Sequence, residues 1–111
     1  WGKKAGVGCR VAGDGEFEPA DLVINATPLG LQAGDALPVE RASLGGFSAV
    51  LDLVYAKGGT ALVRAAREAG VNAADGRGVL VAQGAAAFAR FFGVPAPTEI
   101  MRAAVDDALR P

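Results

Sequence analysis

The sequence predicts an α/β domain in which helices flank a parallel sheet. Two apolar runs, residues 22–26 and 48–55, lack the alternation of a half-exposed strand and are typical of strands covered on both faces. A helical pattern over residues 60–69 lies between the second run and a third short run, residues 71–74. The order strand, helix, strand favours a right-handed parallel crossover. The 111 residues include only 6% aromatic side chains, so we expect one small domain packed mainly with alanine and valine.

The remaining segments are predicted from their glycines, prolines and caps. The first twenty residues carry little pattern beyond a short strand over 5–11 and a turn over 13–15. Residues 27–47 are expected to be loop, because prolines and glycines recur along them. The helix of the crossover begins after Thr60, whose hydroxyl can cap it, and ends at Gly70. Its apolar face comprises Leu62, Ala65, Ala66 and Ala69.

Two further helices are expected near the C-terminus. The first covers residues 79–92 and ends at Gly93, and it is apolar nearly all round, which predicts that it is buried on several sides. The second follows Pro97. Thr98 can cap this helix, and Glu99 suits the positive end of its dipole.

Charge and cysteine content narrow the classes of function. The net charge is −1 with acids and bases interspersed, so neither nucleic acid nor a membrane surface is expected as a partner. The apolar stretches are too short, and too broken by glycine, to span a bilayer. The lone Cys9 suggests a reducing, cytoplasmic setting, and with no histidine to activate it a packing role is expected. The lack of histidine also argues against a metal cluster and a Ser-His-Asp triad.

Polar and glycine-rich sequence follows each predicted strand. Ligands of open parallel sheets bind outside the carboxyl ends of the strands, which directs attention to residues 25–30, 55–60 and 75–78. From the residues alone, Asn25 and Thr27 either build a turn or contact a ligand, and neither alternative is favoured. If the domain takes part in catalysis, it is expected to position a cofactor that carries the chemistry.

Structural explanations are favoured for the other candidates. Tyr55, at a strand end, and Asp52, inside an apolar strand, each need hydrogen-bond partners but no ligand. Lys57, beside two glycines, is expected to be a solvated loop lysine. Gln83 is the most unusual residue, because it lies inside an otherwise apolar helix and an unpaired buried amide costs roughly 1–3 kcal/mol. From the residues alone, a hydrogen bond to a neighbouring loop is favoured over a ligand contact for Gln83.

Several motifs occur together, in one order along the chain: DLVINATPLG, AVLDLVY, KGGTALVRAAREAG, ADGRGVLVAQGAAAF and FFGV. In this order the chain from Asp21 onward resembles the C-terminal part of the shikimate dehydrogenase family, and the GxGxLVAQ pattern is the most specific element. The resemblance implies a partial Rossmann-type parallel sheet with flanking helices. It also implies a division into a lead-in segment (1–20), the C-terminal half of an NADP-binding domain (21–93) and a helix that packs on an absent substrate domain (94–111).

The resemblance further implies a reaction, the reversible NADPH-dependent reduction of 3-dehydroshikimate to shikimate in aromatic amino-acid biosynthesis. It carries ligand contacts onto this chain: the cofactor onto Asn25, Ala26, Thr27, Leu53 and Gly76, and the substrate onto Tyr55 and Gln83. For Gln83 and Tyr55 the ligand interpretation then gains over the structural one, and Asn25 and Thr27 can contact the cofactor while also holding the turn. The family's catalytic Lys and Asp and its glycine-rich pyrophosphate loop have no counterpart here. No catalytic residue is therefore assigned, and the chain alone is expected to be inactive, with weak cofactor affinity.

Alternatives to this interpretation stay open. The protein could prefer NAD or act on quinate, or it could be a non-catalytic ligand-binding module derived from the family. Chance similarity of an unrelated half-domain is disfavoured by the joint presence of Tyr55, Gly76 and Gln83. An unpaired edge on the strand at 22–26 predicts a homodimer, a domain swap or binding to the missing N-terminal domain. Because the chain starts at Trp1, it is expected to be a piece of a longer protein.

Overall fold

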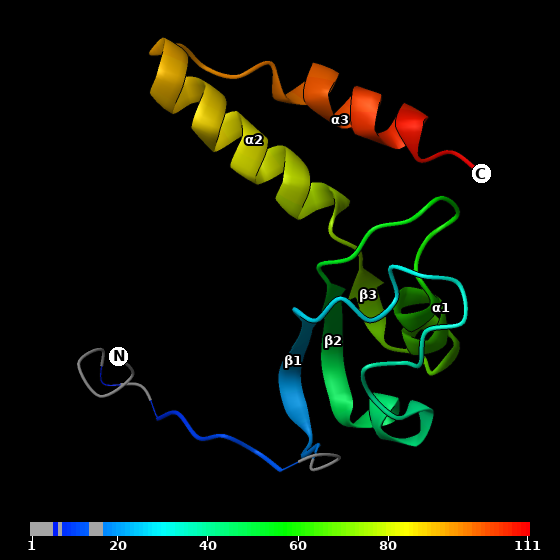
Figure 1. Cartoon of the computed structure of the whole chain (residues 1–111). Helices are drawn as coiled ribbons and strands as arrows, with labels where there is room; N and C mark the ends of the chain where they lie inside the picture. Colours follow the sequence, from blue (N-terminus) through cyan, green and yellow to red (C-terminus); the bar gives the residue numbers. More distant parts are fainter. Residues whose placement is uncertain (1–5, 7, 14–16) are drawn as a thin grey trace.

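A computed structural model describes residues 6, 8–13 and 17–111. The described residues form a three-stranded parallel sheet of order β1-β2-β3, with helices packed beside it (Figure 1). The strands are β1 (Ala20–Asn25), β2 (Phe47–Asp52) and β3 (Asn72–Ala74). The predicted α/β class, with parallel strands and flanking helices, is confirmed.

The N-terminal segment differs from its prediction. Residues 8–13 contain no regular secondary structure, so the strand expected over residues 5–11 is wrong in its described part. The remainder of that strand, at residues 5 and 7, lies outside the described residues. The turn expected over residues 13–15 also lies largely outside them.

One face of the sheet carries the core. Val23, Val50 and Ala73 are register partners across the strands and pack on this face. Helix α1 (Ala61–Glu68) packs against β2 and β3. The core consists of Val39, Leu44, Phe47, Val50, Leu62, Ala65, Ala66 and Val71.

The opposite face is open, and the prediction of strands covered on both faces is wrong for this chain. Leu22 is 49% exposed and Ile24 50% exposed, although both belong to an apolar strand. Their register partners Ala49 and Leu51 lie on the same face, in a shallow hollow that Ala74 also lines. Among the described residues no helix packs on this face, because the long helix that follows β3 runs away from the sheet (Figure 1).

Helix α1 begins after Thr60, as predicted, but ends at Glu68, one residue earlier than the predicted range of 60–69. The Thr60 hydroxyl accepts a hydrogen bond from the backbone N–H of Val63 at 3.3 Å, which makes Thr60 the N-cap, and Gly70 follows the helix with a φ of +78°. Ala69 is exposed rather than on the buried face, because the helix has already ended at Glu68. A short 3-10 helix, η1 (Arg41–Gly46), interrupts the predicted loop and contributes Leu44, which is fully buried, to the core.

Helices α2 (Arg77–Phe92) and α3 (Thr98–Ala108) form a hairpin that extends from the sheet (Figure 1). Gly93 ends α2 in the left-handed conformation, with a φ of +69°. The prediction that α2 is buried on several sides is wrong. In the described part of the chain Val81 is its only fully buried residue, and Phe91 is 82% exposed. The helix packs on α3 rather than on the sheet, which leaves most of its apolar surface uncovered.

The start of α3 is capped differently from the prediction. The Thr98 hydroxyl donates to the carbonyl of Ala96 at 3.3 Å, and Pro97 occupies the N-cap position, so Thr98 does not cap the helix. Glu99 lies in the first turn as expected. Over the described residues, no helix combines the length and apolar character needed to cross a membrane.

Candidate functional site

The carboxyl ends of the strands are tied together at one edge of the sheet. β1 ends at Asn25 and β2 ends at Asp52, and these two residues are register partners. The backbone N–H of Leu53 donates to the carbonyl of Asn25 at 3.0 Å. Beyond β3, the N–H of Gly76 donates to the carbonyl of Val54 at 3.1 Å. The sequence-predicted residues Asn25, Leu53 and Gly76 therefore share this edge.

Asn25 organises the loop that follows β1. Its side chain is 4% exposed, and its Nδ2 group donates to the carbonyl of Leu29 at 3.0 Å and to Oδ1 of Asp52 at 2.8 Å. Its Oδ1 accepts from the backbone N–H of Thr27 at 3.0 Å and from the Thr27 hydroxyl at 2.7 Å. Both donors and the acceptor oxygen of the amide are thus engaged within the protein. The Asn25 side chain therefore holds the loop in shape, and a ligand would contact the neighbouring groups of the loop rather than the Asn25 amide itself.

Asp52 is fully buried at the end of β2. Its Oδ1 accepts from Asn25 and from the backbone N–H of Val54 at 3.1 Å. The second bond turns the chain out of the strand, so the predicted strand over 48–55 is wrong beyond Asp52, and Tyr55 lies outside it. Within the described residues, Oδ2 of Asp52 has no hydrogen-bond partner. The sequence-based preference for a hydrogen-bonded structural role agrees with these contacts.

Gly76 is required at its position by space. A Cβ atom added there would lie 2.1 Å from the carbonyl oxygen of Leu53 and 2.7 Å from its carbonyl carbon. These distances are far inside van der Waals contact, and the obstructing atoms belong to the backbone. The backbone of Gly76 therefore packs directly on that of Leu53, whether or not a ligand is present.

The other sequence-predicted residues are exposed. The loop residue Ala26 and the side chains of Leu53, Tyr55 and Gln83 all face solvent. The expectation that Gln83 is buried is wrong, because α2 leaves the sheet. Among the described residues, neither the Tyr55 hydroxyl nor the Gln83 amide forms a hydrogen bond. The structure connects Asn25, Thr27, Leu53 and Gly76 to one another by direct contacts, and within the described part of the chain no side-chain hydrogen bond joins Tyr55 or Gln83 to that group.

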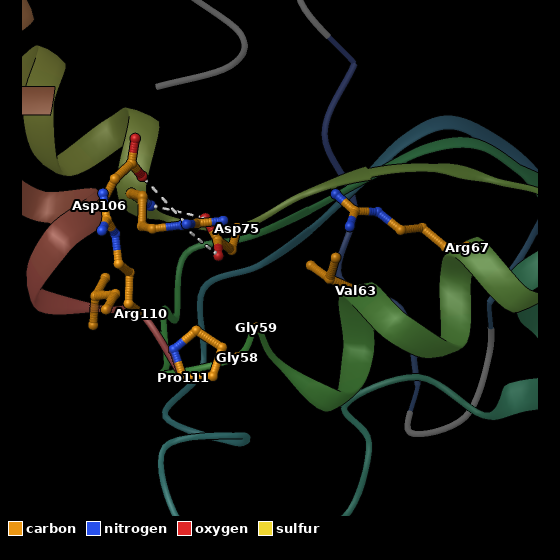
Figure 2. A pocket seen from close by; sticks show the side chains of 10 residues that line it. Gly58, Gly59, Val63, Arg67, Asp75, Asp106, Arg110 and Pro111 are labelled. Carbon is orange, nitrogen blue, oxygen red and sulfur yellow. Dashed lines mark hydrogen bonds and ion pairs between the residues drawn. The ribbon is translucent and has the colours of Figure 1, made fainter. Parts of the chain in front are cut away.

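Two cavities open near the same edge, and the sequence-predicted site residues do not line them. One, of about 330 Å³, lies between the loop before α1, the start of α2 and the end of α3 (Figure 2). The other, of about 430 Å³, lies between residues 30–35 and the start of α1. In the first cavity, the charged lining residues are Arg67, Asp75, Arg77, Asp106 and Arg110.

Arg77 is the centre of the charged cluster in the first cavity. Its Nε lies 2.9 Å from both carboxylate oxygens of Asp75, and its Nη1 lies 3.3 Å from Oδ1 of Asp106 on α3. The Asp75 side chain is only 8% exposed. Its hydrogen bond and its charge raise the pKa of Arg77 above the ordinary value. Sequence reasoning missed this cluster, because the distance of Asp106 along the chain gives no signal of contact.

The second cavity is bordered by a loop that Asp35 closes. The backbone N–H groups of Gly30 and Gln32 each donate to Oδ2 of Asp35 at 2.9 Å. These hydrogen bonds, that from Gln32 first, lower the pKa of Asp35 below its ordinary value. The carboxylate thereby fixes the loop after Gly30, whose φ of +101° favours glycine.

Comparison with known proteins gives consistent matches. Residues 76–105 match the shikimate 5'-dehydrogenase C-terminal domain. The chain is 42% identical over 99 residues to shikimate dehydrogenase (NADP(+)) from Halorubrum lacusprofundi, an alignment that covers 89% of this chain and 34% of that protein. This chain thus spans about a third of the length of that relative.

Two solved structures have a similar fold over most of this chain. A shikimate dehydrogenase in complex with NADP+ is 32% identical with a TM-score of 0.72, over 80% of this chain and 32% of that one. A chorismate mutase/shikimate 5-dehydrogenase fusion protein from Clostridium acetobutylicum is 33% identical with a TM-score of 0.67, over 80% of this chain and 33% of that one. The predicted resemblance is confirmed: the chain is similar to the C-terminal region of shikimate dehydrogenases.

Proposed function

We propose that this chain is the C-terminal part of an NADP-dependent shikimate dehydrogenase, which reversibly reduces 3-dehydroshikimate to shikimate. In this proposal its strand-end edge supplies contacts to the cofactor and the substrate but no catalytic group. The observation that carries the proposal is the junction of the three strand ends, where Asn25, Leu53 and Gly76 are joined by hydrogen bonds and backbone packing. Its sequence counterpart is the 42% identity to a shikimate dehydrogenase (NADP(+)).

The residues of this edge fit a dinucleotide whose reactive ring is flat and largely apolar. Leu53 presents a partly exposed apolar side chain, and Gly76 packs on the backbone of Leu53 and holds it in place. Thr27, in the loop after β1, adds an exposed hydroxyl. When bound, NADP(H) would supply or accept the hydride. Ala26 and the backbone around it would complete the cofactor contacts.

Tyr55 and Gln83 are proposed to contact the substrate. Both side chains are exposed, and within the described residues neither the Tyr55 hydroxyl nor the Gln83 amide forms a hydrogen bond that a ligand would have to replace. The amide of Gln83 can donate to one hydroxyl and accept from another, which suits a polyhydroxylated ring. The family's catalytic Lys and Asp have no counterpart in this chain, so we expect the isolated chain to show no turnover.

The test is a kinetic measurement on the full coding-length protein that contains this chain. We expect NADPH-dependent reduction of 3-dehydroshikimate, and Gln83→Ala should raise KM about tenfold by removing one or two hydrogen bonds. Ala89→Ser, at an exposed position on the same helix, is the matched control and should leave KM unchanged. NADP(H) binding without turnover would instead favour a non-catalytic binding module. An unchanged KM for Gln83→Ala would remove that residue from the substrate site.

A further inference from the structure

The orientation of the Asn25 amide is fixed by two backbone groups. The carbonyl of Leu29 can only accept, so the group facing it at 3.0 Å must be Nδ2. The backbone N–H of Thr27 can only donate, so the group facing it at 3.0 Å must be Oδ1. The amide therefore has a single orientation that satisfies both neighbours.

Asp52 reinforces this orientation from the buried side. Its Oδ1 accepts the second Nδ2 proton of Asn25 at 2.8 Å and also holds the N–H of Val54. A flipped Asn25 would place two oxygens face to face in a site where Asp52 is fully buried, an arrangement that low dielectric makes expensive. Asp52 thus acts on the loop through Asn25.

The consequence reaches the exposed hydroxyl of Thr27. Oδ1 of Asn25 carries no proton, so the 2.7 Å contact requires the Thr27 hydroxyl to donate its only proton to Asn25. One lone pair of the same hydroxyl accepts from the backbone N–H of Leu29 at 3.2 Å. The Thr27 hydroxyl is then left with one free lone pair and no free proton, so it can only accept a further hydrogen bond.

We propose that the chain Asp52–Asn25–Thr27 presents a hydrogen-bond acceptor at the strand-end edge, which takes a hydroxyl or carboxamide N–H of the ligand and not a phosphate oxygen. Asp52 is the positioning residue of this chain of hydrogen bonds. The identity of the ligand rests on the proposed function, since NADP carries ribose hydroxyls, a carboxamide and phosphates. The assignment of the Thr27 hydroxyl as an acceptor depends only on its hydrogen bonds within the protein.

The polarity is tested without ligand, by NMR on the 111-residue chain. We expect the hydroxyl proton of Thr27 and the Nδ2 protons of Asn25 to exchange slowly with water. Asp52→Asn keeps an oxygen acceptor toward Asn25 and Val54, because its amide nitrogen can occupy the place of the unpartnered Oδ2. This variant should therefore preserve the slow exchange of the Thr27 hydroxyl proton and of the Asn25 Nδ2 protons. Asp52→Ala should lose this slow exchange. A Thr27 hydroxyl proton in fast exchange in the unmodified chain would overturn the proposal, whatever the fate of the variants.

The ligand preference is tested by comparing nicotinamide riboside with nicotinamide mononucleotide, which adds a phosphate. Thr27→Val should weaken the binding of both probes by the same factor, about threefold to tenfold, and Thr27→Ser should restore it. A loss confined to the phosphate-bearing probe would refute the acceptor assignment. The 3-acetylpyridine analogue of the mononucleotide, which lacks the carboxamide N–H, separates the carboxamide from the ribose hydroxyls. Failure of the unmodified full coding-length protein to bind any probe would contradict the proposed function, and the NMR result would still decide the polarity.

Discussion

Replacing Gly76 with alanine tests the junction on which the candidate site depends. The added Cβ would stand 2.1 Å from the carbonyl oxygen of Leu53, whereas carbon and oxygen in contact need roughly 3.5 Å. The two backbones must therefore separate by about 1 Å or more, because no flexible side chain can move aside. Such overpacking costs about 1–3 kcal/mol, and loss of the Gly76–Val54 hydrogen bond adds about 1 kcal/mol. We expect Gly76→Ala to lower the free energy of unfolding by about 2–4 kcal/mol.

The assay is urea unfolding followed by circular dichroism, with Gly84→Ala as the matched control. Gly84 lies inside α2, has no positive φ and has nothing within 4 Å of an added Cβ. Alanine there should raise stability by up to about 1 kcal/mol through helix propensity. If Gly76→Ala unfolds at the same urea concentration as the unmodified chain, the packing of this junction is not what the distances indicate.

Three further changes probe other parts of the molecule. Arg77→Met leaves the carboxylate of Asp75, which is 8% exposed, without its cation, and should lower the free energy of unfolding in urea by about 1 kcal/mol. Arg110→Met, whose ion pair is exposed, is the control and should change it by less than about 0.5 kcal/mol. Equal effects of the two changes would mean that the Arg77 ion pair does not stabilise the chain. An NMR titration should give Asp35 a pKa below its ordinary value of 3.8. The stability that the ionised carboxylate contributes is then present above pH 3.8 and is lost as the pH falls through the pKa of Asp35 in the folded chain. A pKa at or above 3.8 would mean that the loop N–H groups do not hold the carboxylate. Ile24→Lys should lower self-association on size-exclusion chromatography, because Ile24 is 50% exposed on an open face of edge strand β1; a chain that stays monomeric at high concentration would contradict this.

The sequence predicted best those features that depend on neighbouring residues. Thr60 as a cap and Gly93 as a helix end follow from local backbone chemistry, and both are confirmed. The boundary of β2 was wrong because its end is set by the Asp52 side chain, which bonds the N–H of Val54. An aspartate inside an apolar run gives no sign, in sequence alone, of which strand-end group it will contact.

Burial was the property that sequence predicted least well. An apolar run indicates that a segment has surface to cover, but it does not say which element covers it. The apolar character of α2 and of the strands predicted burial on several sides, yet Phe91 and Ile24 are largely exposed here. Gln83 is unusual only if its helix is buried, and most of α2 is exposed, including Gln83 itself. The proposed ligand role of Gln83 therefore depends on the GxGxLVAQ motif and on its exposed side-chain amide, and not on the cost of burying an unpaired amide.

The candidate site has two parts, the strand-end edge and Gln83 on α2, and the first is fixed by more contacts than the second. Asn25, Leu53 and Gly76 belong to one hydrogen-bonded edge, whose geometry is fixed by the sheet. Among the described elements, the helix that carries Gln83 packs mainly on α3, so its position relative to that edge depends on the Gly76 contact and on the ion pairs of Arg77. A change at the Arg77 ion pairs should move Gln83 without disturbing Thr27. If both residues serve one reaction, such a change should raise the KM for the substrate while leaving cofactor affinity in place.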